Sequence, residues 1–116
     1  MSVNDDCLFC LISQGSIPAE VLLESPGAMA FRDVDPKAPT HFLVIPKSHF
    51  TDIEDLAAND LNLIGELLAL GAEVAKNQGL TQGYRIVTNT GRDAGQSVSH
   101  LHFHVLGGRS LSWPPG

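Results

Sequence analysis

The segment Ser99–Leu106 alternates histidine with apolar residues and reads Ser-His-Leu-His-Phe-His-Val-Leu. Successive side chains of a β-strand point to opposite faces of a sheet. The segment is therefore predicted to be a strand with three imidazoles on one face, anchored in a core by Leu101, Phe103 and Val105 on the other. Because alternate Cα atoms of a strand lie about 6.6 Å apart, the three imidazoles could contact one small anion or one metal ion.

Turn residues divide the rest of the chain into short elements. The spacing of apolar residues predicts a short helix over Cys7–Gln14 and a long central helix that begins after Asn59 and Asp60 and is ended by Gly79. Apolar runs bounded by turn residues predict four more strands, over Glu20–Ser25, Ala28–Val34, His41–Ile45 and Tyr84–Thr90. About five strands and two helices, in runs rather than in strict alternation, predict an α+β fold with an antiparallel sheet.

Length and charge limit the kind of protein this chain can be. Its 116 residues suffice for one domain. We expect that domain to span residues 1–116, with 1–6 as a flexible N-terminus and 110–116 as a C-terminal tail. The formal net charge of −6, from 7 Lys and Arg against 13 Asp and Glu, argues against a nucleic-acid binder. No apolar run is long enough to span a membrane, and the first residues lack a signal-peptide core, so we expect a cytoplasmic protein that binds no membrane.

The loop before the histidine strand is suited to phosphate. Gly91, Gly95, Gln96 and Ser97 supply backbone N–H groups and a hydroxyl, and loops of this kind bind phosphate oxygens. Imidazole, with an ordinary pKa of about 6.5, can act as a nucleophile or as an acid and base near neutral pH. The pattern favours a phosphate site, while three structural histidines and a metal site made by all three remain alternatives.

Cys7 and Cys10 are the only cysteines of the chain. On a helix, a spacing of three residues places the two side chains one turn apart, close enough to share one ion. In a reducing compartment this spacing favours metal ligation or redox chemistry over a structural disulfide. A closed metal site would need two further ligands; the alternative is a pair of buried or reactive thiols without a metal.

Several ordered motifs resemble one known family. The stretch from Gly95 to Arg109, which contains the three alternating histidines, resembles the signature of the histidine triad (HIT) family. Phe31-Arg32-Asp33, the stretch Ala38–Lys47 and the ending Trp113–Gly116 match further motifs of that family. Together these motifs point to its Hint branch, the purine nucleoside phosphoramidases, and the Cys-x-x-Cys near the N-terminus points to a bacterial or plant type. The resemblance implies a HIT-like sheet with one short N-terminal and one long central helix.

The resemblance also implies a reaction, the transfer of a nucleotidyl group to water. The substrates would be adenosine or guanosine 5′-phosphoramidates, a class that extends to aminoacyl-adenylates, cleaved at the P–N bond. His102 would attack phosphorus and form a nucleotidyl-histidine intermediate, with its second ring nitrogen held by the carbonyl of His100. His104, His41 and Ser97 would support the phosphate charge or the leaving group as further catalytic residues.

A purine nucleotide site follows from the same resemblance. Asp33 matches the acidic residue that binds the ribose hydroxyls, and Phe31 and Val34 match apolar walls of the base pocket. Arg32 stands where we expect histidine in animal members, which leaves the base preference open. The remaining nucleotide-binding residues implied by the family pattern are Asn89, Gly95, Gln96, Ser97, His102 and His104.

The resemblance assigns ligands to a metal and implies an assembly. His49 and His100 match the histidines that complete a Cys₂His₂ site with Cys7 and Cys10, which implies a structural zinc ion. It further implies a homodimer with the long helix and edge strands at the interface, and Trp113 near an active site, either its own or that of the partner.

Two other functions remain open at this point. One is a nucleotide-binding regulatory module in which hydrolysis is incidental. The other is a metalloenzyme that uses all three triad histidines as ligands.

Overall fold

Strand β3 (Thr40–Pro46) is the middle strand of a five-stranded antiparallel sheet and is buried along nearly its whole length. In the computed structural model, which describes residues 6–116, the strand order is β1-β2-β3-β5-β4. The other strands are β1 (Val21–Glu24), β2 (Ala28–Arg32), β4 (Tyr84–Thr88) and β5 (Phe103–Gly107). The helices are α1 (Leu8–Ser13), α2 (Ile53–Asn59) and α3 (Leu61–Asn77). The predicted α+β class with a five-stranded antiparallel sheet, a short first helix and a long central helix is confirmed.

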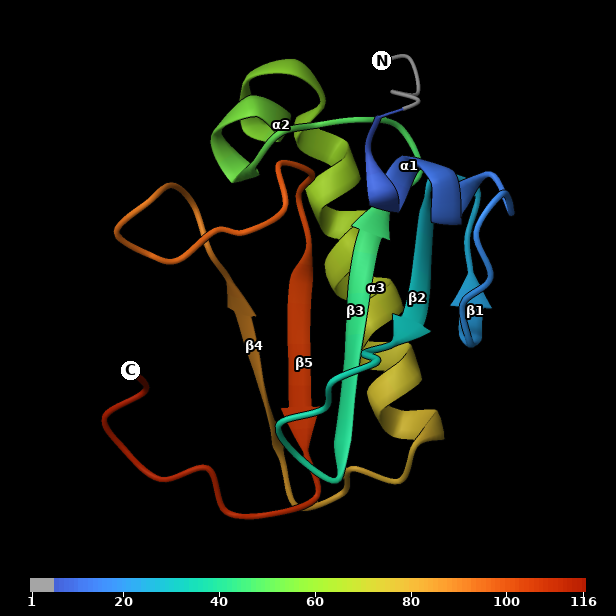
Figure 1. Ribbon diagram of the computed structural model, residues 1–116. Helices are drawn as coiled ribbons and strands as arrows, with labels where there is room; N and C mark the ends of the chain where they lie inside the picture. Colours follow the sequence, from blue (N-terminus) through green and yellow to red (C-terminus); the bar gives the residue numbers. More distant parts are fainter. Residues whose placement is uncertain (1–5) are drawn as a thin grey trace.

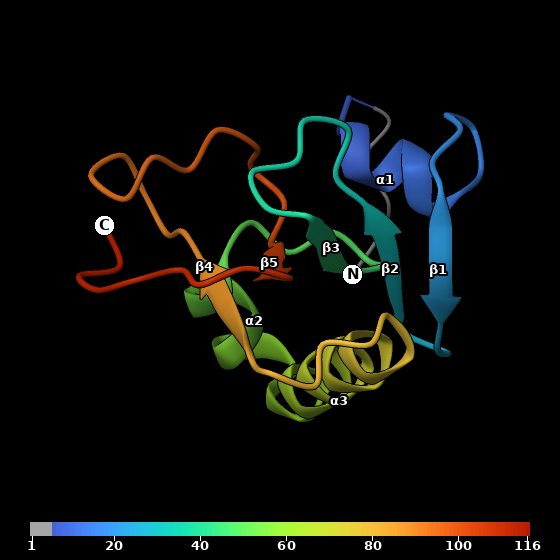
Figure 2. The same cartoon turned by 90° about the horizontal axis from the view of Figure 1, so that it is seen from below.

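The sheet separates two layers that have different tasks. Helices α2 and α3 lie on one side of it, and α1 lies on the other side together with the loop that joins β2 to β3 (Figures 1 and 2). The side chains facing α3 form the larger apolar core, which includes Phe42, Val44, Phe103 and Val105. Those facing α1 form a smaller core around Phe9, Met29, Phe31, Leu43 and Ile45. One face of the sheet therefore holds the fold together, and much of the other face is left for a site.

Helix α3 forms where the apolar spacing predicted it. Leu67, Leu70, Val74 and Ala75 are buried, and their spacing of three and four residues places them on one stripe of the helix. Gly79 follows the helix with a φ of 76°, a left-handed conformation that favours glycine and ends helices. The long helix is therefore positioned by one continuous face buried against the sheet.

The structure shortens one predicted strand and adds a helix that was not predicted. Strand β5 begins at Phe103, so Ser99–His102 is not part of the sheet. Here Leu101 N–H donates to the carbonyl of Phe50, at 2.7 Å, instead of to a neighbouring strand. Helix α2, which the apolar pattern did not predict, begins after Asp52, whose carboxylate accepts from the N–H of Asp55.

The two ends of the chain were predicted to be less regular. Of the segment 1–6, expected to be flexible, only Asp6 belongs to the described residues. The segment 110–116 contains no helix or strand and runs along β4, where the guanidinium group of Arg85 donates to the carbonyls of Leu111 and Ser112. Within residues 6–116, no helix has both the length and the apolar character needed to cross a membrane.

Candidate functional site

The face of the sheet opposite α3 carries two of the predicted catalytic side chains, His41 and His104. In the antiparallel pairing, Leu43 on β3 lies opposite His104 on β5, and His104 lies opposite Val87 on β4. His41 lies opposite Leu106 in the same way. Because residues paired across strands share a face, His41 and His104 project from neighbouring strands to the same side of the sheet.

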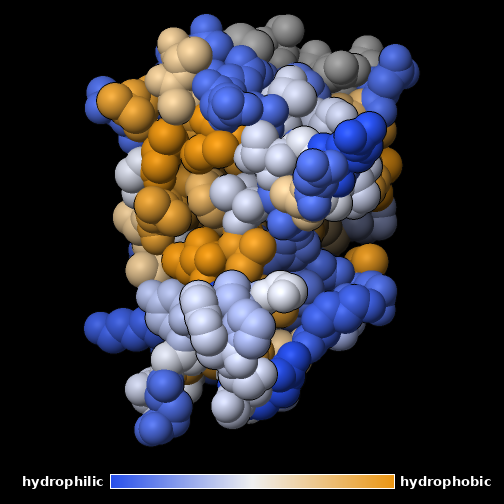
Figure 3. All heavy atoms as spheres, turned by 90° about the vertical axis from the view of Figure 1, so that its left-hand side faces the viewer, coloured by the Kyte–Doolittle hydropathy of each residue, from blue (hydrophilic) through white to orange (hydrophobic). Residues whose placement is uncertain are grey.

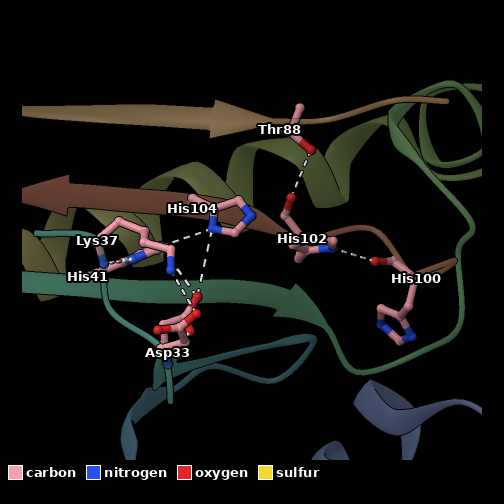
Figure 4. Close-up of polar contacts among 8 residues, drawn as sticks. Asp33, Lys37, His41, Thr88, His100, His102 and His104 are labelled. Carbon is pink, nitrogen blue, oxygen red and sulfur yellow. Dashed lines mark hydrogen bonds and ion pairs between the residues drawn. The ribbon is translucent and has the colours of Figure 1, made fainter. Parts of the chain in front are cut away.

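His102 has one ring nitrogen occupied and one free to react. Its Nδ1–H donates to the carbonyl of His100 at 2.8 Å, so the lone pair of the neutral ring lies on Nε2 (Figure 4). Thr88 Oγ1 donates to the carbonyl of His102 at 2.8 Å, and the ring of Phe9 packs edge-on against the imidazole with centroids 5.1 Å apart. These contacts fix the backbone, the ring plane and the tautomer of His102.

A chain of hydrogen bonds sets the tautomer of His104. The backbone N–H of Lys37 donates to His41 Nδ1 at 3.0 Å, so a neutral His41 carries its hydrogen on Nε2. His41 Nε2 lies 2.9 Å from His104 Nδ1 and donates to it (Figure 4). A neutral His104 therefore carries its own hydrogen on Nε2. The backbone amide of Lys37 in this way decides which atom of His104 can donate to a ligand.

The electrostatics of the site keep these rings neutral. Burial, with smaller contributions from His102 and His41, lowers the pKa of His104 to about 4. Burial also lowers the pKa of His41, although the carboxylate of Asp33 opposes that effect. At neutral pH these two imidazoles are uncharged, as the hydrogen-bond chain requires.

Asp33 lies at the edge of the histidine group. Its Oδ1 accepts from the backbone N–H of Asp35 at 2.8 Å, and its Oδ2 lies 3.4 Å from His41 Nε2 and 4.0 Å from His104 Nδ1. The side chain is only 16% exposed, so a mostly buried carboxylate lies beside the buried imidazole of His41 and the partly buried imidazole of His104. The carboxylate keeps acceptor capacity for a polar ligand at the mouth of the site.

An apolar cavity opens between α1 and the histidines. It has a volume of about 360 Å³ and is bounded by Phe31, Asp33 and Val34 on one side and by Ser97, His102 and His104 on another. Phe9 and Leu43 form part of its wall. The structure thus brings most of the residues predicted to bind a nucleotide to one cavity, where aromatic and aliphatic walls meet a few polar groups.

Three predicted residues lie outside this cavity. Gln96 holds the loop: its side-chain oxygen accepts from the N–H of Gly91, and its amide nitrogen donates to the carbonyls of Thr51 and Val98. Gly95 is an exposed turn residue with a φ of 78° and lines neither this cavity nor the groove described next. Asn89 lines that groove instead, on the other side of His104.

The groove beyond His104 was not predicted from the sequence. It has a volume of about 430 Å³ and is bounded by Lys37, Arg85, Asn89 and Arg109, with the C-terminal residues on its outer side. Trp113, predicted to lie near an active site, is 80% exposed and does not line the groove of its own chain, although Pro114–Gly116 do. The alternating pattern of β4 was the available signal for Arg85, because it places this residue on the face of Val87.

A second histidine group lies near the N-terminal end of α1. Cys7 Sγ is 3.2 Å from His100 Nδ1, and Cys10 Sγ is 3.3 Å from His49 Nδ1 and 3.4 Å from His100 Nδ1. One ligand atom from each of the four residues lies within 4.8 Å of the others. The cysteines form no disulfide. The structure therefore brings together all four predicted metal ligands.

The donor set of this group fits a tetrahedral metal ion. His100 Nε2–H donates to the carbonyl of Pro46 at 2.9 Å, which leaves the lone pair on Nδ1, directed at the sulfur atoms. The backbone N–H of Cys10 donates to Cys7 Sγ, a contact that favours the thiolate. A zinc ion with bonds of about 2.0 to 2.3 Å places its ligand atoms roughly 3.3 to 3.8 Å apart, close to the separations found here.

The three triad histidines do not converge on one point. Within residues 6–116, two groups of metal-ligating side chains lie close enough to share an ion: the Cys₂His₂ group, which contains His100, and the group of Asp33, His41 and His104. Neither contains all three triad histidines, so the geometry gives no support to a tri-His metal site.

Comparison with known proteins identifies the family. The HIT domain family matches residues 14–111, and an uncharacterized HIT-like protein of Synechococcus elongatus is 47% identical over 98% of this chain and 100% of its own length. The crystal structure of a HIT family hydrolase from Legionella pneumophila superposes with a TM-score of 0.90, at 48% identity, and covers 95% of this chain and 99% of its own. A histidine triad nucleotide-binding protein from Candida albicans superposes with a TM-score of 0.80, at 30% identity, over 93% of this chain and 82% of its own.

The α+β fold and the histidine-lined cavity are therefore those of a histidine triad protein. The chain belongs to the HIT domain family.

Proposed function

We propose that this protein hydrolyses the P–N bond of purine nucleoside 5′-phosphoramidates through a covalent nucleotidyl intermediate on His102. The observation that carries the proposal is the 2.8 Å bond from His102 Nδ1 to the carbonyl of His100, which leaves Nε2 as a lone-pair nucleophile at the cavity. A neutral imidazole in this state needs no base to activate it, and covalent catalysis divides one difficult displacement into two easier ones. The name of the Legionella relative, a HIT family hydrolase, agrees with this class of reaction.

The proposed first step transfers the nucleotidyl group from the amine to His102. Nε2 of His102 bonds to phosphorus, the P–N bond of the substrate breaks, and the amine nitrogen takes the bonding pair together with a proton. That proton comes from solvent, because a neutral His104 that gave up its Nε2–H would become an imidazolate. His104 instead donates a hydrogen bond to the phosphate or the leaving nitrogen, supported by His41 and, at the rim, by Ser97. In the second step water attacks phosphorus, releases His102 and returns a proton to solvent.

The proposed ligand is an adenine or guanine nucleotide, and aminoacyl-adenylates fall in the same substrate class. The apolar walls from Phe31 and Val34 suit a purine, and the carboxylate of Asp33 suits the ribose hydroxyls. Asn89 would reach the phosphate from the neighbouring groove. Gly95 and Gln96 would act by shaping the loop that carries Ser97, since the side chain of Gln96 is bonded within that loop. The Candida relative is described as a nucleotide-binding protein, which agrees with this assignment.

We propose that Cys7, Cys10, His49 and His100 hold a structural zinc ion. With four protein ligands the ion would have no open position and would tie α1 to the end of β3. The Cys-x-x-Cys motif supports the proposal that this protein belongs to the Hint branch and is of the bacterial or plant type. We propose that residues 1–116 form one domain.

A homodimer is the proposed assembly. Strand β4 is an edge of the sheet, and the apolar side chains of Tyr84 and Ile86 on it, with Leu61 and Leu68 on α3, are 37 to 67% exposed. Figure 3 shows apolar side chains gathered on this side of the molecule. An uncovered apolar surface beside the unpaired edge of a strand suits pairing with a second copy.

The test of the hydrolase uses adenosine 5′-phosphoramidate, with release of ammonia and AMP as the readout. Wild-type protein is expected to turn it over, and His102→Ala is expected to lose at least about a thousandfold in kcat while it still binds AMP in calorimetry. Quenching in an alkaline denaturant during turnover, where the P–N bond of adenylyl-histidine survives, should trap an adenylyl group on the wild-type chain and none on the variant. Full turnover by His102→Ala would refute the proposed nucleophile, and AMP binding without any turnover by the wild type would favour a nucleotide-binding regulatory module.

A further inference from the structure

The groove beyond His104 collects positive charge in an acidic protein. The chain has seven Lys and Arg residues, and three of them, Lys37, Arg85 and Arg109, line this one groove of about 430 Å³. The apolar cavity on the other side of His104 has no Lys or Arg in its wall. The two hollows that meet at His104 thus differ sharply in charge.

The two guanidinium groups are oriented by neutral partners. Arg85 donates to the carbonyls of Leu111 and Ser112, and Arg109 donates to those of Lys37 and Ser110. In the part of the chain that the structure describes, no carboxylate lies within 4 Å of either guanidinium, and of the three cations only Lys37 has an ion pair.

The carboxylate that pairs with Lys37 belongs to Asp35, at 2.7 Å. Carbonyls fix the direction of a guanidinium group without cancelling its charge. If Gly116, on the outer wall, carries a carboxylate, the charges of Arg85 and Arg109 still exceed that one negative charge, and the groove stays positive.

The groove lies where a leaving group would lie. In phosphoryl transfer, the attacking and leaving atoms are roughly in line on opposite sides of phosphorus. His102 lines the apolar cavity only, whereas His104, two residues further along the chain, lines both the cavity and the groove. A nucleotide attacked by His102 would therefore direct its leaving amine past His104 and toward Arg85.

We propose that this groove is the leaving-group subsite and that it selects amines carrying a carboxylate, such as an amino acid joined to phosphorus through its nitrogen. The inference rests on the proposed hydrolase and names the substrate class of that same site. Arg85 and Arg109 act as specificity determinants, since they attract the carboxylate and take no part in the bond changes at phosphorus.

The test compares two substrates whose leaving groups differ at one position, a carboxylate against a neutral amide. Adenosine 5′-phosphoramidates of glycine and of glycinamide, each joined through the α-nitrogen, have leaving groups of nearly equal size. We expect kcat/KM at low ionic strength to be about fivefold higher for the glycine compound, a preference of the size found for partly exposed ion pairs. Added salt should reduce the ratio, because it screens exposed charges.

Charge variants assign that ratio to the groove. In Arg85→Gln/Arg109→Gln the ratio should fall to about one, and in Arg85→Lys/Arg109→Lys it should remain above one. Lys76→Gln removes an exposed cation of α3, far from the groove lining, and should leave the ratio unchanged. Because the readout is a ratio, a general loss of rate caused by a displaced C-terminal segment cancels.

The outcomes separate the two proposals. A wild-type ratio of one or below, or a ratio that the double Gln variant retains, overturns the anionic subsite while hydrolysis of adenosine 5′-phosphoramidate still supports the hydrolase. If the wild type hydrolyses none of these compounds, the hydrolase is refuted. The same two compounds are then stable ligands, and equal affinities in calorimetry would overturn the subsite as well.

Discussion

The two histidine groups of this protein lie on the same side of the sheet and use the same residue type in opposite ways. In the group of Cys7, Cys10, His49 and His100, the two ring nitrogens of His100 are both occupied, one by the sulfur atoms and one by a backbone carbonyl. In the group around His104, the hydrogen bonds run in one direction from a backbone amide and leave the last Nε2–H available to a ligand.

This difference shows what separates a structural from a reactive histidine. Burial lowers the pKa of both His100 and His104 to about 4, so burial alone does not distinguish them. What distinguishes them is the partner of the second ring nitrogen. In the closed group, made by Cys7, Cys10, His49 and His100, this nitrogen is bonded to a protein atom. In the open group, made by Asp33, His41 and His104, it faces a cavity. The following predictions test that contrast, beginning with the largest expected change in free energy.

Removing the thiols should destabilise the closed group most. In Cys7→Ser/Cys10→Ser we expect metal content to fall from near one zinc ion per chain to none, and the free energy of unfolding to fall by about 4 kcal/mol. Serine at position 7 can still cap α1, so a lost helix cap does not explain the change. Metal analysis and urea unfolding measure both effects. Chelated wild-type protein should match the variant in stability, and full metal content in the variant would contradict the assignment.

Acid should destabilise the protein through the open group. Between the ordinary pKa of about 6.5 and the folded pKa of His104 near 4, the unfolded chain binds a proton at this residue that the folded chain does not bind. The free energy of unfolding should therefore fall as pH is lowered through this window, by about 3 kcal/mol from His104 at pH 4.

Urea unfolding across this pH range measures the slope. His104→Gln, which cannot titrate, should show a shallower decline than the wild type, and any effect of acid on a bound metal is common to both proteins. Parallel curves for the two proteins would contradict the neutral, buried state of His104.

The direction of the hydrogen-bond chain predicts a ranking of kinetic effects. His104→Ala should lower kcat for adenosine 5′-phosphoramidate by about a hundredfold, because it removes the ring N–H that is proposed to donate to the reacting phosphate. His41→Ala should lower kcat by only about tenfold, because His41 is proposed to act through His104. Steady-state kinetics, with AMP affinity as a control, tests the order, and a larger loss for His41→Ala would reverse the roles.

A change on α3, in neither histidine group, provides the reference. Glu66 accepts from Ser25 Oγ and from the backbone N–H of Gly27 at the β1–β2 turn, and these two contacts lower its pKa. Glu66→Gln should cost about 1 kcal/mol of stability through weakened hydrogen bonds. Metal content and turnover should be unchanged, and a loss of either would mean that the two groups are less independent of the remaining fold than proposed.

Periodicity predicted the elements whose burial is local and continuous. The run His41–Ile45 reads as a strand buried on both faces, and β3 extends it by one residue at each end. Helix α2 buries only Leu56, so its sequence carries too little apolar pattern to be predicted. The predicted strand from Ser99 was wrong in its first half. There the N–H of Leu101 donates to the carbonyl of Phe50, in the loop after β3, instead of to a neighbouring strand.

The candidate site was predictable where a family motif fixes it and not where packing creates it. Cys7 and His100 are 93 residues apart, and only the resemblance to the HIT family paired them. Arg85 and Arg109 line one groove because β4 pairs with β5 and the chain turns back after β5, and no short sequence pattern predicts either fact. The alternation of β4 gave the face of Arg85 but not the groove it lines.

Strand β3 also limits how the chain can change through evolution. His41 lies near one end of it, in the open group, and the carbonyl of Pro46 at the other end holds His100 in the closed group. Four residues of the strand lie between the two points, which are five residue steps, about 17 Å, apart. Inserting or deleting one residue between them would turn one end to the opposite face of the sheet. Surface loops can gain or lose residues freely, but we expect the length of this strand to be inherited unaltered, because both groups depend on it at once.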